Sequence, residues 1–273
     1  MVLRLDPRLP LVWRSPTSLQ LGISRPVVVL DDVSVAAERM LAALRGGVPR
    51  GGLAMLGRAA GLRDDEVEAF LEQVAPALLR QPAGRAERIV VVSGEGPTAE
   101  GIGLLLSREG FAVRIARTVA EAQREVCDLA VAVGHFVLEP ELHGLWLRRD
   151  TAHLPVVLGD AGATIGPLVQ PGQSACLYCV QLHATDADAA WPAIASQLWG
   201  RTAAADTALV ASEAAAIATR LVVGWFELGA AAASDRIVLD AATGATGSVA
   251  VDPHPACGCL SPGFANAEAA TLA

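Results

Sequence analysis

Four of the five cysteines fall into two close pairs, Cys176-x-x-Cys179 and Cys257-x-Cys259. Each pair can place two thiolates on one side of a metal ion, and four thiolates complete the tetrahedral shell of a structural zinc site. Such a shell leaves no open position for water, so the ion is predicted to hold the fold together. The alternative is that these are buried or redox-active cysteines whose pairing is accidental.

The fifth cysteine is predicted to be structural. Cys127 precedes Asp128 at the start of an apolar run, which favours a small core residue over a nucleophile. His183 and His254 lie near the cysteine pairs in the sequence, either as groups that support the metal ligands or as ordinary surface residues.

A glycine-rich turn, Gly94-x-Gly96-x-x-Ala99, follows an apolar run and precedes a helical pattern. This order is that of a Rossmann-type phosphate loop. The turn does not suit a diphosphate, because Glu95 places a carboxylate where phosphate charge would lie and Pro97 removes a backbone N–H. We therefore predict a degenerate turn that binds no nucleotide.

The composition excludes several chemistries. The chain has 273 residues, a formal net charge of -8 and 52% hydrophobic residues, and all 21 of its basic residues are arginine. Without lysine there is no P-loop lysine, no kinase strand lysine and no Schiff base with pyridoxal phosphate. Arg117 follows the second predicted strand, where a dinucleotide-binding fold has an acidic residue, so NADP binding through a 2′-phosphate remains an alternative.

The stretch QPAGRAER at residues 81–88 separates two segments of different character. We assign residues 1–82 to a first domain, 83–87 to a linker, 88–264 to a second domain and 265–273 to a flexible tail. Through Pro82, ten arginines face nine acidic residues, whereas the rest of the chain has 11 arginines and 20 acidic residues. The excess negative charge therefore belongs to the second segment.

The first segment combines short extended runs with helical patterns. The extended runs, separated by Ser-Pro and Arg-Pro turns, lie at residues 11–14, 18–23 and 27–31. Ser34 is a predicted N-cap for a helix that ends at Gly46, a second helix covers residues 53–60, and a third begins at Asp64. A small sheet with three helices is a winged-helix arrangement.

Charge on the third predicted helix decides between two kinds of partner. This helix is acidic and has no arginine before Arg80, so it would repel phosphate, and we expect no nucleic acid. A winged helix can instead accept an extended peptide as an added strand, because an exposed sheet edge offers unpaired backbone groups beside an apolar helix. Any one of the apolar side chains concerned could simply belong to the core. The predicted peptide-binding residues are Val27, Val28, Val29, Leu30, Val67, Phe70, Leu71 and Val74, with Arg14 and Arg25 complementing an acidic peptide.

The second segment is predicted to have an α/β fold with a mostly parallel sheet. Its apolar runs, which alternate with helical stretches, lie at residues 88–93, 112–116, 128–133 and 154–158. The apolar stretch 203–233 carries Glu213, Arg220 and Glu227 on one helical face, which favours a helix of a soluble protein over a membrane span. With no signal-peptide pattern at the N-terminus, we expect a cytoplasmic protein without a membrane partner.

The stretch GPLVQPGQSACLYCVQLH at residues 166–183, with Trp191-Pro192 and PACGC at residues 255–259, resembles the ThiF-like proteins that accompany YcaO enzymes in azoline-forming peptide biosynthesis. The resemblance spans nearly the whole chain. It implies a precursor-recognition element for the leader of a ribosomally made peptide, followed by a fold like that of ubiquitin-activating enzymes. It also implies zinc on the four cysteines, a homodimer, and a separate YcaO-type cyclodehydratase that binds ATP.

Active adenylating relatives need cationic and amide side chains around the phosphates. This chain has no lysine, its single asparagine is Asn266, and no Asp-x-Asp with a following Ser-Asn-Leu-x-Arg-Gln stretch occurs after Arg117. Charge in a phosphoryl transition state would meet too few positive groups. We predict a non-catalytic scaffold that presents a precursor peptide to the YcaO-type enzyme and binds no ATP. The alternatives are an active adenylating enzyme and an NADP-binding oxidoreductase partner.

Overall fold

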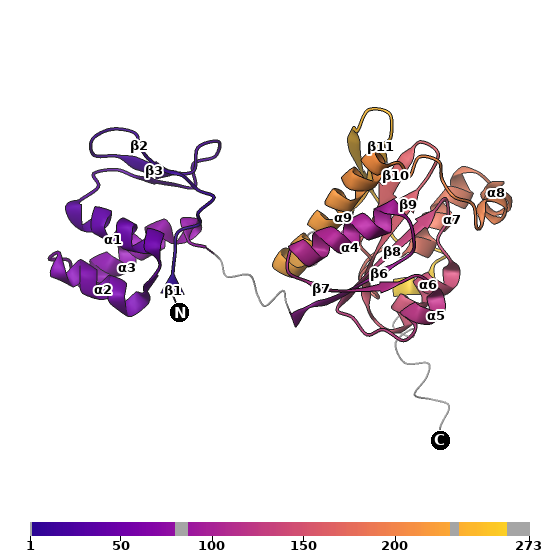
Figure 1. The fold of residues 1–273 in the computed structure, drawn as a ribbon, viewed down its shortest axis with the longest axis horizontal. Helices are drawn as coiled ribbons and strands as arrows, with labels where there is room; N and C mark the ends of the chain where they lie inside the picture. Colours follow the sequence, from indigo (N-terminus) through magenta and orange to yellow (C-terminus); the bar gives the residue numbers. More distant parts are fainter. Residues whose placement is uncertain (1, 80–86, 230–234, 261–273) are drawn as a thin grey trace, which may run out of the picture. The chain divides into compact units, whose positions relative to one another are not determined.

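The computed structural model describes residues 2–79, 87–229 and 235–260 of the chain (Figure 1). The chain divides into two compact units, Met1–Pro82 and Ala83–Ala273, here called unit 1 and unit 2. The predicted linker residues 83–86 and the tail 265–273 lie outside the described residues. Each unit is described by itself.

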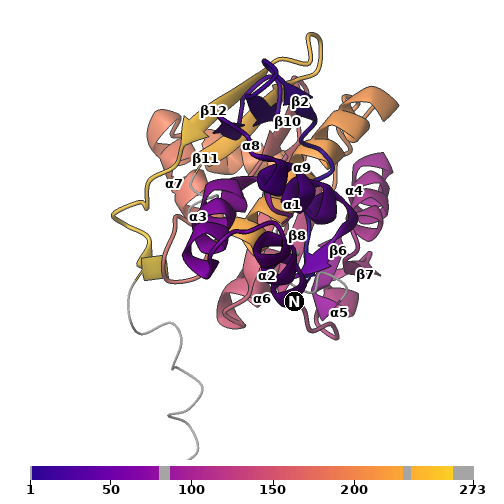
Figure 2. The ribbon, with the colours of Figure 1, turned by 90° about the vertical axis from the view of Figure 1, so that its left-hand side faces the viewer.

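Unit 1 places a small antiparallel sheet on one side of three helices, as both ribbon views show (Figures 1 and 2). The sheet has the order β2-β3-β4, with β2 at Leu11–Trp13, β3 at Leu19–Leu21 and β4 at Val28–Leu30. A separate pair joins β1 (Val2–Leu3) to β5 (Val48–Pro49). All three strands of the sheet fall within the extended runs predicted from the sequence.

The helices of unit 1 begin where the sequence places polar or turn residues. They are α1 (Val35–Gly46), α2 (Arg50–Ala59), α3 (Asp64–Val74) and a short 3-10 turn, η1 (Ala75–Ala77). The Ser34 hydroxyl accepts from the Ala37 N–H at 3.1 Å, which confirms the predicted N-cap. A Cβ on Gly57 would lie 2.4 Å from Val67, so this glycine allows α2 and α3 to approach closely.

Unit 2 is built on a seven-stranded sheet with the order β12-β11-β10-β9-β8-β6-β7. The strands β6 (Ile89–Ser93), β7 (Ala112–Ala116), β8 (Leu129–His135) and β9 (Ala152–Leu158) run parallel. The antiparallel strands β10 (Gly162–Ile165), β11 (Asp235–Asp240) and β12 (Thr246–Ala250) extend the sheet beyond β9. The predicted mostly parallel sheet is confirmed, whereas the antiparallel extension was not predicted.

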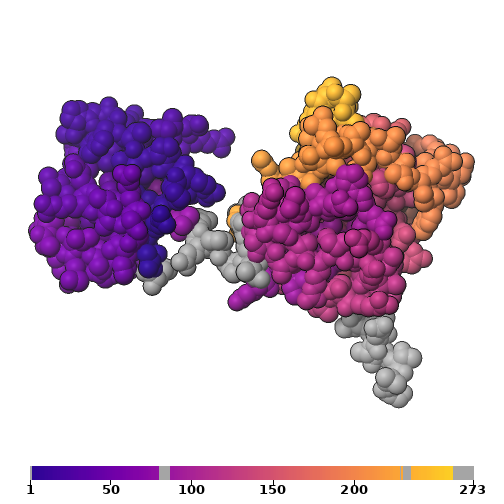
Figure 3. Space-filling model, viewed as in Figure 1, coloured from indigo at the N-terminus to yellow at the C-terminus, as the bar shows by residue number. Residues whose placement is uncertain are grey.

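Helices cover both faces of this sheet. The helices α4 (Pro97–Arg108) and α9 (Ala208–Leu228) pack side by side on one face, where their surfaces adjoin in the space-filling view (Figures 1 and 3). A Cβ on Gly101 would lie 3.2 Å from the Ala215 Cβ, so glycine permits this close packing. The short α5 (Val119–Ala122) and α6 (Pro140–Arg148) cover the other face. The strands β6, β8 and β9 therefore bury side chains on both faces, whereas the edge strand β7 leaves Arg114 and Ile115 exposed.

The helix α9 is long and apolar enough to cross a membrane by length and composition alone. In the fold it is a core helix, because the face that carries Val210, Ala214, Ala218 and Val222 is buried against α4 and the sheet. Two further helices, α7 (Leu177–Ala187) and α8 (Trp191–Leu198), follow the sheet strand β10.

Candidate functional site

The four paired cysteines converge on one cluster. The Cys176 Sγ lies 3.9 Å from the Cys179 Sγ and 3.7 Å from the Cys257 Sγ, and the Cys179 Sγ lies 3.5 Å from the Cys259 Sγ. All four sulfurs lie within 4.8 Å of one another. A disulfide would bring two sulfurs to about 2.05 Å. Tetrahedral coordination with metal–sulfur bonds of about 2.3 Å sets neighbouring sulfurs about 3.8 Å apart, which the observed spacing matches.

Two segments distant in the sequence build this cluster. Cys176 is the N-cap residue of α7 and Cys179 lies in its first turn, whereas Cys257 and Cys259 follow β12. Cys176 and Cys179 are fully buried beside Val169. Burial raises the pKa of Cys259 to about 11 and raises that of Cys176 as well, so these two thiols need a nearby cation to become thiolates at neutral pH. The donor set and spacing fit a metal ion.

The fifth cysteine has no part in this cluster. Burial raises the pKa of Cys127 to about 11, so its thiol stays protonated at neutral pH and makes a poor nucleophile. His183 and His254 lie in the same two segments as the four cysteines, with their rings in an edge-on contact at 4.8 Å. The spacing of the sequence motif therefore predicted which cysteines the fold brings together.

The glycine-rich turn lies between β6 and α4, at the carboxyl ends of the parallel strands. Gly94 has φ +124°, and a Cβ there would lie 2.5 Å from the Val133 carbonyl oxygen. Gly96, with φ +95°, is the N-cap of α4, and Pro97 begins the helix. Ala99 is buried against the sheet. The turn thus has the backbone form of a phosphate loop. It follows β6, whose neighbours in the sheet are β7 on one side and β8 on the other.

A carboxylate of the chain itself occupies the N-terminus of α4. The Asp206 Oδ1 accepts from the Thr98 hydroxyl at 2.6 Å, and its Oδ2 lies 3.1 Å from where a Cβ on Gly96 would be. The Asp206 side chain is only 5% exposed, and its Oδ2 lies 4.0 Å from His135 Nε2. The N-terminus of a helix is where nucleotide phosphates bind in such folds. Sequence reasoning missed Asp206.

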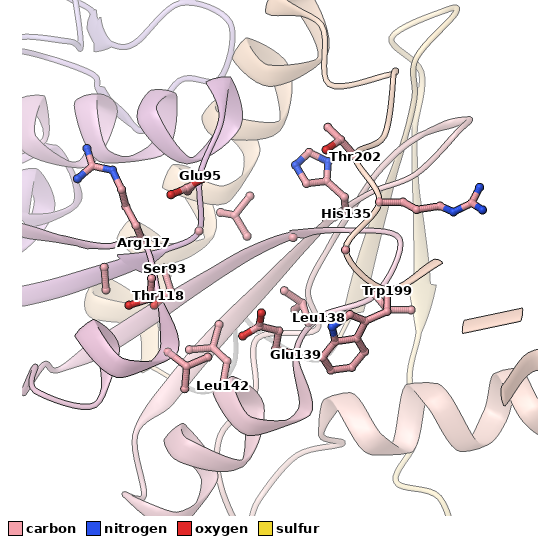
Figure 4. Close-up of a pocket in the computed structure, with 18 residues that line it drawn as sticks. Ser93, Glu95, Arg117, Thr118, His135, Leu138, Glu139, Leu142, Trp199 and Thr202 are labelled. Atoms are coloured by element: carbon pink, nitrogen blue, oxygen red, sulfur yellow. The ribbon is translucent and has the colours of Figure 1, made fainter. Parts of the chain in front are cut away.

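Beside the turn lies a cavity of about 320 Å³ (Figure 4). Its lining includes the carboxylates Glu95 and Glu139 and the indole of Trp199, while Arg117 lies across the cavity from Trp199. The Ser93 hydroxyl is buried and has no hydrogen-bond partner among the described residues. The lining is mixed in charge, because Arg117 and Arg201 accompany the two carboxylates.

The structure divides the predicted peptide-binding residues between the surface and the core. Val27 and Val29 are exposed, as are Arg14 and Arg25. The remaining predicted residues have their side chains buried in the core of unit 1, namely Val28, Leu30, Val67, Phe70, Leu71 and Val74. The helix α3 therefore offers little apolar side-chain surface, and the accessible part of the predicted groove is the backbone edge of β4.

Two backbone hydrogen bonds fix which residues of β3 face β2. The Arg14 N–H donates to the Ser18 carbonyl at 2.8 Å, and the Gly22 N–H donates to the Pro10 carbonyl at 2.9 Å. Hydrogen-bonded pairs alternate along an antiparallel ladder. Gln20, midway between these two bonds, therefore also directs its backbone groups towards β2, and its two neighbours in β3 direct theirs towards β4.

The same alternation identifies the free backbone groups of β4. Leu19 and Leu21 pair with Leu30 and Val28, respectively, so these residues exchange the hydrogen bonds between β3 and β4. The N–H and C=O of Val29 then point away from β3. Within the described part of unit 1, β4 is an outer strand of its sheet. Val29 thus presents a donor and an acceptor to an added strand.

Comparison with known proteins identifies the fold. Neither a protein-family model nor a curated protein matches the chain. Among solved structures, the heterocyclase TruD has a TM-score of 0.69 and 16% identity over 95% of this chain and 42% of TruD. A heterocyclase solved with substrate and cofactor has a TM-score of 0.66 and 16% identity over 92% of this chain and 38% of its own. E. coli MccB, solved with AMPCPP and MccA, has a TM-score of 0.63 and 13% identity over 95% of this chain and 99% of MccB.

This chain therefore spans about two fifths of the length of the heterocyclases and nearly all of MccB. The predicted α/β fold with a mostly parallel sheet is confirmed by these likenesses. At such low identities the likeness shows a shared fold and no more.

Proposed function

We propose that this chain is a non-catalytic scaffold that binds the leader of a ribosomally made precursor peptide and presents the core to a separate YcaO-type cyclodehydratase. One combination of features carries the proposal. Unit 1 has a free β4 edge, and the nucleotide-type turn of unit 2 has its helix N-terminus filled by Asp206. The first feature suits an extended peptide, and the second opposes ATP.

The structural neighbours support a role in peptide modification. Two of them are heterocyclases, and MccB was solved together with MccA. This chain covers 42% and 38% of the heterocyclase chains. In the proposed function a YcaO-type enzyme holds ATP and activates the backbone amides that close into azolines.

The leader is proposed to add to β4 as a further strand. Its backbone would exchange hydrogen bonds with the N–H and C=O of Val29, and its alternate side chains would lie over the exposed Val27. Arg14 and Arg25 are exposed in the same unit and complement an acidic leader. Because α3 keeps its apolar face in the core, backbone pairing supplies most of the proposed affinity.

Adenylation by this chain is opposed by charge. Asp206 and Glu95 place two carboxylates around the turn, and the chain has no lysine to offset a triphosphate. Stabilising a phosphoryl transition state requires positive groups aimed at the equatorial oxygens. The scaffold instead accelerates the partner by holding the substrate, which raises the local concentration of the core at the enzyme without any reacting group here.

The metal proposed for the four-cysteine cluster is zinc. Four thiolates in a tetrahedral arrangement form the usual closed shell of structural zinc, and a closed shell supplies no water for catalysis. Cys176, Cys179, Cys257 and Cys259 would hold the ion and thereby join α7 to the segment that follows β12. The homodimer stays a prediction.

Titration of the full chain tests the scaffold role. The labelled probes are synthetic peptides made from a short reading frame that neighbours the gene of this chain, namely its leader, its core and the whole precursor. We expect saturable binding of the leader and the whole precursor but not of the core. We also expect ATP-dependent cyclisation by the partner enzyme to rise when this chain is added. Failure of the leader to bind would overturn the proposal, and pyrophosphate exchange by this chain alone would favour the adenylating alternative.

A further inference from the structure

A second group of side chains that can bind metals lies beside the four-cysteine cluster. His183 and Asp186 come from α7, and His254 comes from the segment that follows β12. Their potential ligand atoms lie within 4.8 Å of one another. This group, here called the His–Asp network, therefore spans the same two segments as the cysteines. The network could bind a second cation, or it could position the cysteines that are proposed to bind zinc.

The spacing of its atoms distinguishes these roles. Tetrahedral coordination with metal–nitrogen or metal–oxygen bonds of about 2.0–2.1 Å sets neighbouring ligand atoms about 3.3 Å apart. The His254 Nε2 and the Asp186 Oδ2 are only 2.8 Å apart, which is a hydrogen bond rather than the edge of a coordination shell. The same comparison that supports a metal among the four sulfurs thus opposes one here.

Both imidazoles have their protons fixed by the surrounding backbone. The Ala256 N–H donates to His254 Nδ1 at 3.1 Å, so His254 Nε2 carries the proton and donates to Asp186. The His183 Nε2 lies 2.9 Å from the Asp252 carbonyl oxygen and donates to it. The bonds from His254 to Asp186 and from His183 to Asp252 join α7 to the segment that follows β12. The bond from Ala256 to His254 orders that segment internally.

His254 also contacts the cysteines through its own backbone. Its N–H donates to the Cys179 sulfur. Its carbonyl accepts from the Cys257 N–H at 2.9 Å and closes the turn that presents the second cysteine pair. One residue therefore connects α7, the Cys179 sulfur and the turn that holds Cys257.

The position of Asp186 indicates that the network has a purpose beyond solubility. Asp186 lies in the last turn of α7, where the helix dipole opposes a negative charge. Its side chain is 69% exposed, whereas that of His254 is 10% exposed. The hydrogen bond to the buried imidazole offsets the unfavourable position.

We propose that the His–Asp network positions the segment that carries Cys257 and Cys259 against α7, and so holds the four sulfurs at the spacing that zinc requires. The proposal rests on the zinc site proposed above. His183, Asp186 and His254 touch no metal in this role and act through the ligands. Groups that orient metal ligands in this way typically contribute ten- to hundredfold to metal affinity.

The experiment measures zinc content and zinc release from the full chain into an excess of a chromophoric chelator. Asp186→Ala is expected to release zinc roughly ten- to hundredfold faster than wild type. Asp186→Asn is expected to recover most of the difference, because its amide oxygen still accepts from His254 Nε2. The matched control is Asp252→Ala, which removes an exposed carboxylate from the same segment and keeps the carbonyl that His183 uses.

Each result supports or overturns the positioning role. Equal release rates for Asp186→Ala and wild type, or equally fast release from Asp252→Ala, would reject it. Two equivalents of zinc in wild type and one in Asp186→Ala would instead make the network a second cation site. Wild type without zinc would reject the zinc site itself, separately from the network. Cobalt-substituted protein adds a spectroscopic check, since displaced thiolates change the charge-transfer bands even where folding is unaffected.

Discussion

Replacement of Val29 with proline tests the β4 edge directly. Val29 carries the N–H that faces the free edge, and its side chain is 38% exposed, so the change leaves the core of unit 1 intact. Proline removes that donor, and its ring fills the space that an incoming carbonyl oxygen needs. The lost hydrogen bond and the clash together cost about 1.5–3 kcal/mol, which is a roughly ten- to hundredfold rise in the Kd for the leader.

Two matched variants separate backbone pairing from side-chain contact and from unfolding. Val29→Thr keeps the N–H and the branched Cβ, so its Kd is expected to stay within about twofold of wild type. Val28→Pro removes an N–H that faces β3 and is expected to lower the free energy of unfolding by about 3 kcal/mol. Val29→Pro, at an exposed edge position, should change that free energy by less than about 0.5 kcal/mol.

Fluorescence anisotropy of a labelled leader peptide gives the Kd, and urea denaturation followed by circular dichroism gives the free energy of unfolding. Wild-type affinity in Val29→Pro would refute strand addition at β4. Weak binding by Val29→Thr, equal to that of the proline variant, would show that the side chain rather than the backbone carries the contact. In either case the leader would have to bind elsewhere on the chain.

Three other perturbations address the metal, the response to acid and the start of α4. Joint replacement of Cys176 and Cys179 by serine is expected to remove about one equivalent of zinc by elemental analysis, whereas the same change at the fifth cysteine keeps it. Burial lowers the pKa of His143 to about 3 and that of His153 to about 4, while unfolded histidines titrate near 6.5. The stability that the two neutral histidines contribute is complete above about pH 6.5 and is lost as the pH falls towards 4. Between about pH 7 and 5.5 the free energy of unfolding, measured by urea denaturation, should therefore fall by about 2 kcal/mol, and a double glutamine variant should show a smaller fall. Asp206→Ala is expected to lower the free energy of unfolding by about 1–2 kcal/mol, because the Thr98 hydroxyl in the first turn of α4 loses its hydrogen-bond acceptor. Asp206→Asn should lower it less.

The parallel strands β6, β8 and β9 were predictable because they are buried on both faces. Such strands appear as continuous apolar runs, and β8 begins within one residue of the predicted run 128–133. The antiparallel extension lacks that signal. β12 has the sequence TGSVA and is exposed along its whole length, while β10 is only four residues long. Neither strand has an apolar alternation that distinguishes it from a loop.

Helical periodicity identified the buried face of α3 but not what covers it. Val67, Phe70, Leu71 and Val74 repeat at the spacing of one helix face, and that face packs into the core of unit 1. A groove and a core require the same residues at the same spacing. The sheet edge is different, because strand order and hydrogen-bond alternation are needed to show that the backbone of Val29 is free.

The position of Asp206 shows why the sequence alone could not predict what lies at the start of α4. It precedes Thr207, the N-cap of α9, so locally it belongs to an ordinary helix start, yet its carboxylate bonds to Thr98 at a separation of 108 residues. A phosphate charge held about 4 Å from a carboxylate is repelled by about 4 kcal/mol at an effective dielectric constant near 20, which is nearly a thousandfold in affinity. Glu95 adds to this repulsion, while Arg117 and Arg201 line the cavity beside the turn. Asp206, which bonds to Thr98 and lies against Gly96, is therefore the group that most directly opposes a phosphate at this turn.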